Sequence, residues 1–151
     1  MILLEMILGY LGPVIAIMVW ILTALASWRV FLKAGVPGWK ALIPIYREYN
    51  IFRIAWKEKQ FFIYIGVVIV YSVMEVITQR AGVLSIWGTV GAVLNLVVIY
   101  YEVMVKIYLA RSFGRSRGFG LFLYFLEPVA ISALGFGTDV YGGPAGNPDA
   151  K

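Results

Sequence analysis

The chain has 151 residues, of which 62% are hydrophobic and 14% are charged, and its formal net charge is +5. A soluble domain is nearer to half apolar and a quarter charged, so this composition indicates a membrane protein and excludes both a small soluble globule and a disordered chain. Cys and His are absent, which excludes disulfides, the usual zinc sites, thiol catalysis and His-ligated haem, and we expect no cofactor.

Four apolar segments follow one another at about residues 6–28, 61–79, 83–109 and 119–136. Most are long enough to cross the ~30 Å hydrocarbon core as helices. The first is preceded by Glu5 and followed by Arg29, which favours a retained anchor over a cleaved signal peptide. The fourth is short and broken by Pro128, which leaves open a spanning helix or a re-entrant hairpin.

A strand alone in lipid would leave its amides unpaired, so each span is expected to be helical. The sequence therefore predicts an all-α membrane protein: a four-transmembrane-helix bundle over residues 1–136 with an amphipathic interfacial segment on its cytoplasmic side. The remaining residues, 137–151, are rich in Gly and Pro and are expected to form a polar flexible tail.

The distribution of basic residues predicts the orientation. Seven Lys and Arg residues lie between the first two spans and four lie between the third and fourth. Because an excess of Lys and Arg marks the cytoplasmic side, we predict a multi-pass protein of the cell membrane with both termini outside. The charge lies between apolar segments, so it is expected to meet anionic lipid rather than nucleic acid.

The cytoplasmic segment 38–58 contains Pro44, after which Ile45, Tyr49, Phe52 and Trp56 form one apolar stripe at helical spacing. Such a helix beside a span is expected to lie in the headgroup plane. The alternative is that the segment only packs over the cytoplasmic ends of the spans. The candidates for contact with lipid or a partner are Trp39, Lys40, Arg47, Arg53, Trp56 and Lys57.

Four polar residues within the spans are candidates for chemistry: Asn95, Glu102, Lys106 and Glu127. A carboxylate at bilayer depth must be paired, protonated or facing a cavity, so Glu127 is either a cation or proton site or part of a kink that packs polar groups against a neighbouring helix; packing is favoured. Glu102 and Lys106 are four residues apart and are expected to form a local ion pair. Asn95 lies among small residues and is expected to hydrogen-bond Glu127.

Catalytic groups do not assemble in the sequence. Without His, a serine nucleophile needs a lysine base, and Lys106 and Ser112 are the only close pair, with no neighbour that would activate them. The two Asp residues, Asp139 and Asp149, lie in the polar tail, so they cannot form an intramembrane dyad. The sequence therefore favours a protein that is not an enzyme.

Several motifs resemble a family of small bacterial multi-span membrane proteins of unknown function, some of which are labelled signal-peptidase-like. The resemblance covers about residues 25–142. It is carried by the run Lys33-Ala-Gly-Val-Pro-Gly-Trp-Lys-Ala-Leu-Ile-Pro-Ile-Tyr46, by Leu109-Ala-Arg-Ser-Phe-Gly114 and by the repeated Gly-Phe-Gly of 118–120 and 135–137. It implies a membrane fold but no activity, and no serine here has the Ser-Met setting of a signal peptidase.

The function we expect is that of an accessory or assembly subunit of a larger membrane complex. Its expected partners are membrane lipids, anionic on the cytoplasmic face, and other membrane protein subunits or a second copy of the chain. The alternative is a small transporter or ion-conducting protein that uses Glu127 and Asn95.

Overall fold

The computed structural model describes residues 2–81 and 86–147, with side chains described for residues 9–79 and 88–147. Within these ranges the elements are α1 (Ile2–Lys33), the 3-10 helix η1 (Gly38–Ala41), α2 (Pro44–Ala55), α3 (Glu58–Ala81), α4 (Ile86–Ser112), α5 (Arg117–Phe125) and α6 (Glu127–Phe136). The described part of the chain contains no strand, which confirms the all-α prediction.

Three of the described helices are long and apolar enough to cross a membrane. They are α1 over Gly9–Lys33, α3 over Glu58–Gln79 and α4 over Gly88–Ser112. They correspond to the first three predicted spans, although residues 83–85 of the third lie outside the described residues. By length and composition the chain is a multi-pass membrane protein.

The fourth predicted span, 119–136, is not one helix. It is divided into α5, with 9 residues, and α6, with 10, and the chain breaks at Leu126 (φ −129°, ψ 52°). Pro128 causes the division, because it has no N–H to donate to the carbonyl of Tyr124 and its ring would clash there, whereas it is tolerated in the first turn of α6. Neither piece is long enough to cross the bilayer.

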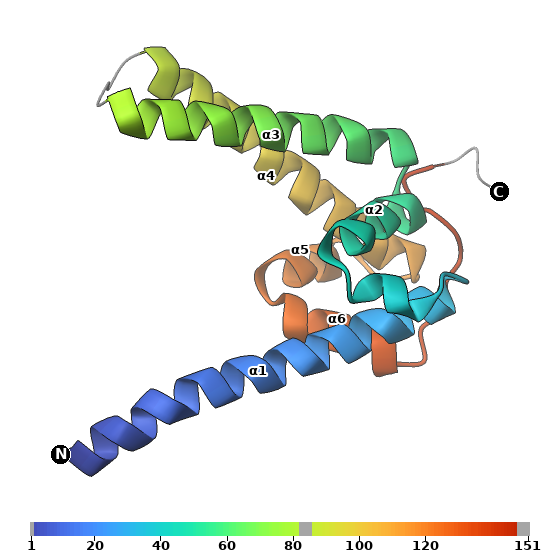
Figure 1. Ribbon diagram of the computed structural model, residues 1–151. Helices are drawn as coiled ribbons and strands as arrows, with labels where there is room; N and C mark the ends of the chain where they lie inside the picture. The colour runs from blue at the N-terminus through green and yellow to red at the C-terminus, as the bar shows by residue number, and fades with distance from the viewer. Residues whose placement is uncertain (1, 82–85, 148–151) are drawn as a thin grey trace.

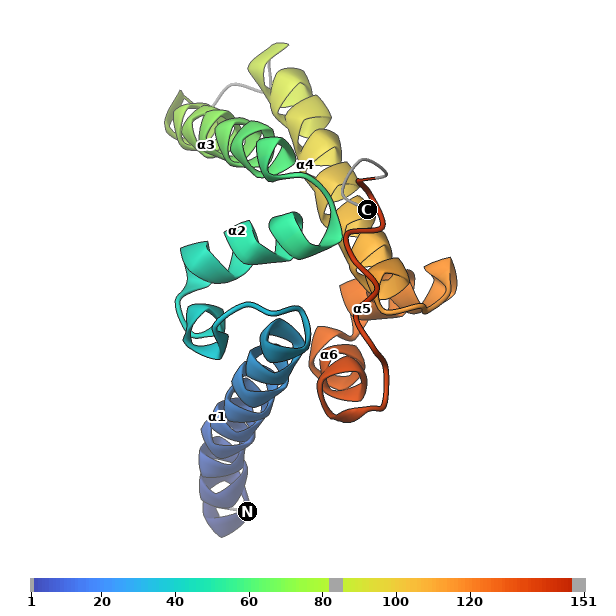
Figure 2. The ribbon, with the colours of Figure 1, turned by 90° about the vertical axis from the view of Figure 1, so that its right-hand side faces the viewer.

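The helices splay apart from one end of the molecule (Figures 1 and 2). The α3–α4 pair extends on one side and α1 on the other. Among the described residues α1 packs against α6 and η1 and makes no close backbone contact with α3 or α4. An open V therefore replaces the predicted bundle of four spans. We call its closed end, formed by η1, α2, α5, α6 and residues 137–147, the cap.

The last turns of α1 are anchored to α6. A Cβ added at Gly135 would lie 2.6 Å from the carbonyl oxygen of Ala26, so only glycine allows this close approach. Lys33 Nζ donates to the carbonyl oxygens of Leu134 at 2.6 Å and Gly137 at 2.7 Å. A cation here satisfies the free carbonyls at the end of α6. In contrast, residues 9–22 of α1 are exposed.

Helix α2 packs over the ends of α3 and α4. Its buried residues include Ile51, Phe52 and Ala55, whereas Ile45 of the predicted apolar stripe is 72% exposed. Trp56 packs against the rings of Tyr101 and Tyr108 of α4, at centroid distances of 5.8 and 5.0 Å. The structure therefore agrees with the alternative in which this segment covers the ends of the spans.

The predicted flexible tail is hydrogen-bonded to the rest of the cap over much of its length. The Gly142 amide donates to the carbonyl of Ser112 at 2.8 Å, and the Gly146 amide donates to the carbonyl of Ala55 at 3.0 Å. The hydroxyl of Tyr141 donates to the carbonyl of Ile54 at 2.8 Å. Residues 148–151 of that prediction lie outside the described residues.

Candidate functional site

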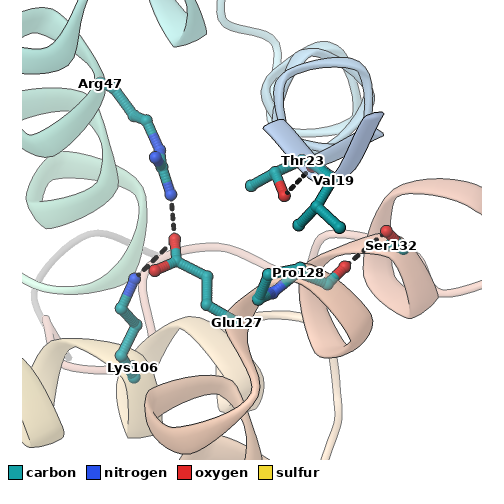
Figure 3. Close-up of polar contacts among 7 residues, drawn as sticks. All are labelled: Val19, Thr23, Arg47, Lys106, Glu127, Pro128 and Ser132. Atoms are coloured by element: carbon teal, nitrogen blue, oxygen red, sulfur yellow. Dashed lines mark hydrogen bonds and ion pairs between the residues drawn. The ribbon is translucent and has the colours of Figure 1, made fainter. Parts of the chain in front are cut away.

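The carboxylate of Glu127 lies at the centre of a charge cluster in the cap (Figure 3). It is in an ion pair with the guanidinium of Arg47 on α2 and accepts a second contact from Lys106 Nζ on α4 at 3.0 Å. The exposed fraction is 24% for the side chain of Arg47, 11% for that of Lys106 and 30% for that of Glu127. One carboxylate thus joins α2, α4 and α6, and we call these three residues the triad.

Local structure favours a carboxylate at this position. Glu127 is in the first turn of α6, where the unpaired amides of a helix N-terminus stabilise negative charge. The break at Leu126 turns the chain at the point where α6 approaches α4 and α2. The predicted interpretation of Glu127 as a packing residue at a kink fits this geometry.

A cavity of about 310 Å³ lies beside the triad. Acidic groups of three helices share its wall with aromatic rings, and the residues concerned are Glu48, Phe52, Tyr64, Glu102, Val105, Lys106, Tyr124 and Glu127. The hydroxyl of Tyr64 donates to Glu102 Oε1 at 3.2 Å. No group of His, Cys, Asp and Glu side chains suited to a metal ion occurs among the described residues, so this wall is not assigned as a metal site.

Glu48 lines this cavity from α2, which lies outside the spans. Burial raises the pKa of its carboxyl above the ordinary value of 4.5, although the nearby cations of Lys106 and Arg47 act in the opposite direction. The carboxylates of Glu127 and Glu102 add to the increase. Burial therefore favours the neutral form of the Glu48 carboxyl.

Two predicted contacts of the intramembrane candidates are wrong. Within the described residues no ion pair joins Glu102 and Lys106, since Lys106 is directed to Glu127 and Glu102 accepts from Tyr64. Asn95 does not reach Glu127, because it lies on α4 11 residues before Lys106, about 16 Å along the helix axis.

The predicted contact residues of segment 38–58 also separate in space. Arg47 belongs to the triad and Trp56 is packed against α4. Trp39 is about half exposed and stacks near Tyr46, with Lys40 Nζ 5.9 Å from its ring centroid. Arg53 and Lys57 are half-buried and do not line the cavity. Sequence reasoning missed Glu48, Tyr64 and Tyr124, and the adjacency of Glu48 to Arg47 was the only available signal for them.

A second polar cavity, of about 360 Å³, lies between the other ends of α3 and α4. We call it the α3–α4 groove, and it is lined by Tyr71, Glu75, Thr78, Gln79, Gly88, Gly91, Ala92 and Asn95. Within the described side chains, Glu75 accepts only from Gln79 of its own helix, at 3.4 Å. The amide of Asn95 has no hydrogen-bond partner within the described residues. Polar groups with incomplete hydrogen bonding therefore face each other across two spans.

Replacing Glu127 by Gln is expected to destabilise the protein by about 2 kcal/mol, because Arg47 and Lys106 then share no counter-charge while they remain partly buried. The measurement is unfolding in detergent micelles. Glu58→Gln is the control, since Glu58 lies at the exposed start of α3 and a charge there is expected to matter little. Equal stability of wild type and Glu127→Gln would contradict the role of the triad.

Replacing Glu48 by Gln is expected to stabilise the protein at pH 8. Because the folded-state pKa is raised above the ordinary value of 4.5, the wild type loses stability as pH rises from that value through the folded-state pKa. The difference in unfolding free energy between Glu48→Gln and the wild type should increase as the pH rises from 4.5 through the folded-state pKa, and it should disappear below about pH 4. Thermal unfolding from pH 4 to 8 measures it, with Glu58→Gln at the exposed start of α3 as the control. An advantage that shrinks with rising pH would contradict the assignment.

Comparison with known proteins identifies a family but no activity. The model of a family of unknown function, DUF5684, matches residues 39–144, more than two thirds of the chain. No curated protein and no solved structure matches the chain. The matched range begins in η1, includes the whole triad and ends in the cap. The chain belongs to this family of unknown function.

Proposed function

We propose that the protein is a non-enzymatic accessory or assembly subunit of a larger membrane complex. The observation that carries the proposal is the α3–α4 groove, in which Glu75 and Asn95 line a cavity and have few hydrogen-bond partners among the described side chains. Polar side chains between spans associate helices, because in hydrocarbon they have no water to bind. A polar helix of another subunit would complete these contacts.

The open V adds support. Most of α1 has no packing partner within the described chain, although its last turns are anchored to α6. Membrane helices associate through close packing and small residues, and α1 carries Gly12 and Ala16 four residues apart on one face. A Cβ at Gly12 would meet nothing within 4 Å, so this face has room for a neighbouring helix.

The cavity beside the triad gives less support to an enzyme. Its lysine, Lys106, is in an ion pair with Glu127, and its lining contains no serine or threonine. Nucleophilic catalysis needs a free base beside a nucleophile. The transporter alternative was based on Asn95 and Glu127 acting together. The two residues line different cavities, so their positions give no support to a shared ion path, and no second function is proposed.

The proposed orientation places the cap in the cytoplasm. Three spans leave the termini on opposite sides, so the C-terminus is cytoplasmic and only the N-terminus is outside, in place of two outer termini. Residue 140 and Arg111 then lie on one side, because the tail is hydrogen-bonded to the end of α4 through Ser112. The excess of Lys and Arg in the cap agrees with this orientation.

The absence of Cys allows a direct test of the orientation. Single variants Val140→Cys and Arg111→Cys, both at exposed positions, are labelled with a membrane-impermeant maleimide in intact and in permeabilised cells. Both are expected to react only after permeabilisation. Labelling of Val140→Cys in intact cells would restore a fourth crossing and contradict the proposal.

Native mass spectrometry of the protein extracted with its lipids tests the subunit function. The wild type is expected to carry another membrane protein in fixed ratio, and Glu75→Leu with Asn95→Leu should reduce that ratio about tenfold, since each interhelical hydrogen bond contributes about 1 kcal/mol. Leu96→Ala is the matched control, because Leu96 is exposed beside Asn95 but outside the groove. A wild type found only as monomer, or variants that keep the partner as the control does, would contradict the proposal.

A further inference from the structure

The turn between α5 and α6 places its side chains in the opposite way to a turn in water. Its large apolar side chains are exposed: Phe125 by 76%, Leu126 by 51% and Val129 by 59%. The charged residue of the turn, Glu127, points inward to the other two members of the triad (Figure 3). In water a turn exposes its charges and buries large apolar groups, so this arrangement indicates apolar surroundings.

Two glycine contacts place the α5–α6 hairpin between two spans and inside their ends. Gly120 of α5 lies against Ile107 of α4, and an added Cβ would overlap the backbone there. Gly135 of α6 lies against Ala26 of α1 in the same way. Ile107 is five residues before the end of α4 and Ala26 is seven before the end of α1, which is about 8 and about 10 Å along the helix axes.

These contacts lie at the depth of the hydrocarbon. The apolar stretches of α1 and α4 have 25 residues each. A helix of that length, centred in the ~30 Å core, extends beyond it by only about 4 Å at each end. Contacts 8 to 10 Å inside the ends of the two helices are therefore below the headgroups.

The turn lies deeper than the glycine contacts. Tyr124, near the end of α5, lines the same cavity as Glu102, which is ten residues before the end of α4. Figure 1 shows the turn between α1 and α4, directed toward the open side of the V. Both ends of the hairpin return to the cap, since α5 begins five residues after α4 ends and the last turn of α6 accepts from Lys33.

The backbone of the turn is hydrogen-bonded as an apolar environment requires. The amide of Leu126 donates to the carbonyl of Phe122 at 2.8 Å, and the carbonyl of Leu126 accepts from the amide of Val129 at 3.1 Å. The residues on both sides of the break line the polar cavity. Irregular backbone at membrane depth is tolerated where it is packed in protein or lines such a cavity.

We propose that the α5–α6 hairpin is a re-entrant membrane element, with its turn in contact with the acyl chains of lipids. Phe125, Leu126 and Val129 form the contact surface. Lipid is favoured over a helix of another protein, because these side chains are large and apolar, whereas membrane helices associate through small or polar residues. The turn then separates hydrocarbon from the polar cavity of the cap. This contact depends neither on a partner subunit nor on which side of the membrane the cap faces.

Spin labels on this cysteine-free chain test the lipid contact. Phe125→Cys and Val129→Cys are labelled and reconstituted, without other proteins, in vesicles of phosphatidylglycerol and phosphatidylethanolamine. Collisions of each label with oxygen, which concentrates in hydrocarbon, are compared with collisions with a nickel chelate, which stays in water. Both labels are expected to collide more with oxygen. Leu96→Cys, on an exposed face of α4, is the control for lipid, and Val140→Cys, in the exposed tail, is the control for water.

Two results of this measurement would overturn the proposal. Collisions mainly with the nickel chelate, as at Val140, would place the turn in water. Few collisions with either reagent would show that protein covers it. Val129→Cys repeats the measurement on α6, so a folding defect at Phe125 does not prevent a result.

The two ends of the hairpin must also lie on the same side of the membrane. Arg117→Cys at the exposed start of α5 and Val140→Cys beyond the end of α6 are labelled with a membrane-impermeant maleimide. Both should react in intact cells, or both only after permeabilisation. Reaction of the two under opposite conditions would make the segment a span and would overturn the re-entrant assignment.

Discussion

The fold depends on one carboxylate that pairs with two cations from distant parts of the chain. Glu127 lies 80 residues from Arg47, yet their pairing with Lys106 joins α2, α4 and α6 within the cap. A buried ion pair gives little net stability compared with apolar packing, but losing one partner is costly because the other charges stay desolvated. We therefore interpret the triad as a device that specifies one arrangement of the cap.

The cap holds the helices together at one end of the molecule, while at the other end they are apart. Around the triad, α1 is anchored through Lys33 and Gly135, and the tail is hydrogen-bonded to α2 and α4. Beyond the cap α1 and the α3–α4 pair diverge (Figure 2). In a membrane the exposed apolar surface can meet lipid, so the polar α3–α4 groove remains as the place that indicates a specific partner.

The parts of the fold that follow from local chemistry could be predicted from the sequence. Length and hydropathy located three spans, and lipid excludes any lone strand. The fourth span is not confirmed. Pro128, whose missing N–H divides the segment into α5 and α6, had left a re-entrant hairpin open, and the two short helices fit that alternative better than one spanning helix. Within segment 38–58 the sequence correctly predicted a helix after the break at Pro44. Which face of that helix is buried could not be predicted, because it depends on where α3 and α4 lie.

The site could be predicted only in part. A carboxylate in an apolar segment indicated that Glu127 is paired, protonated or facing a cavity. In the structure it is paired and lines a cavity, but its partners could not be identified from the sequence. An ion pair between Glu102 and Lys106 was predicted from their helical spacing alone. In the structure Lys106 pairs with Glu127 of another helix instead.

A double-mutant cycle on Arg47 and Glu127 tests the central claim most directly. The unfolding free energy of wild type, Arg47→Gln, Glu127→Gln and the double variant is measured in the same micelles. If the triad specifies the cap, the two changes are strongly non-additive, with a coupling energy of about 1 kcal/mol or more. Additive effects, within about 0.5 kcal/mol, would contradict the account.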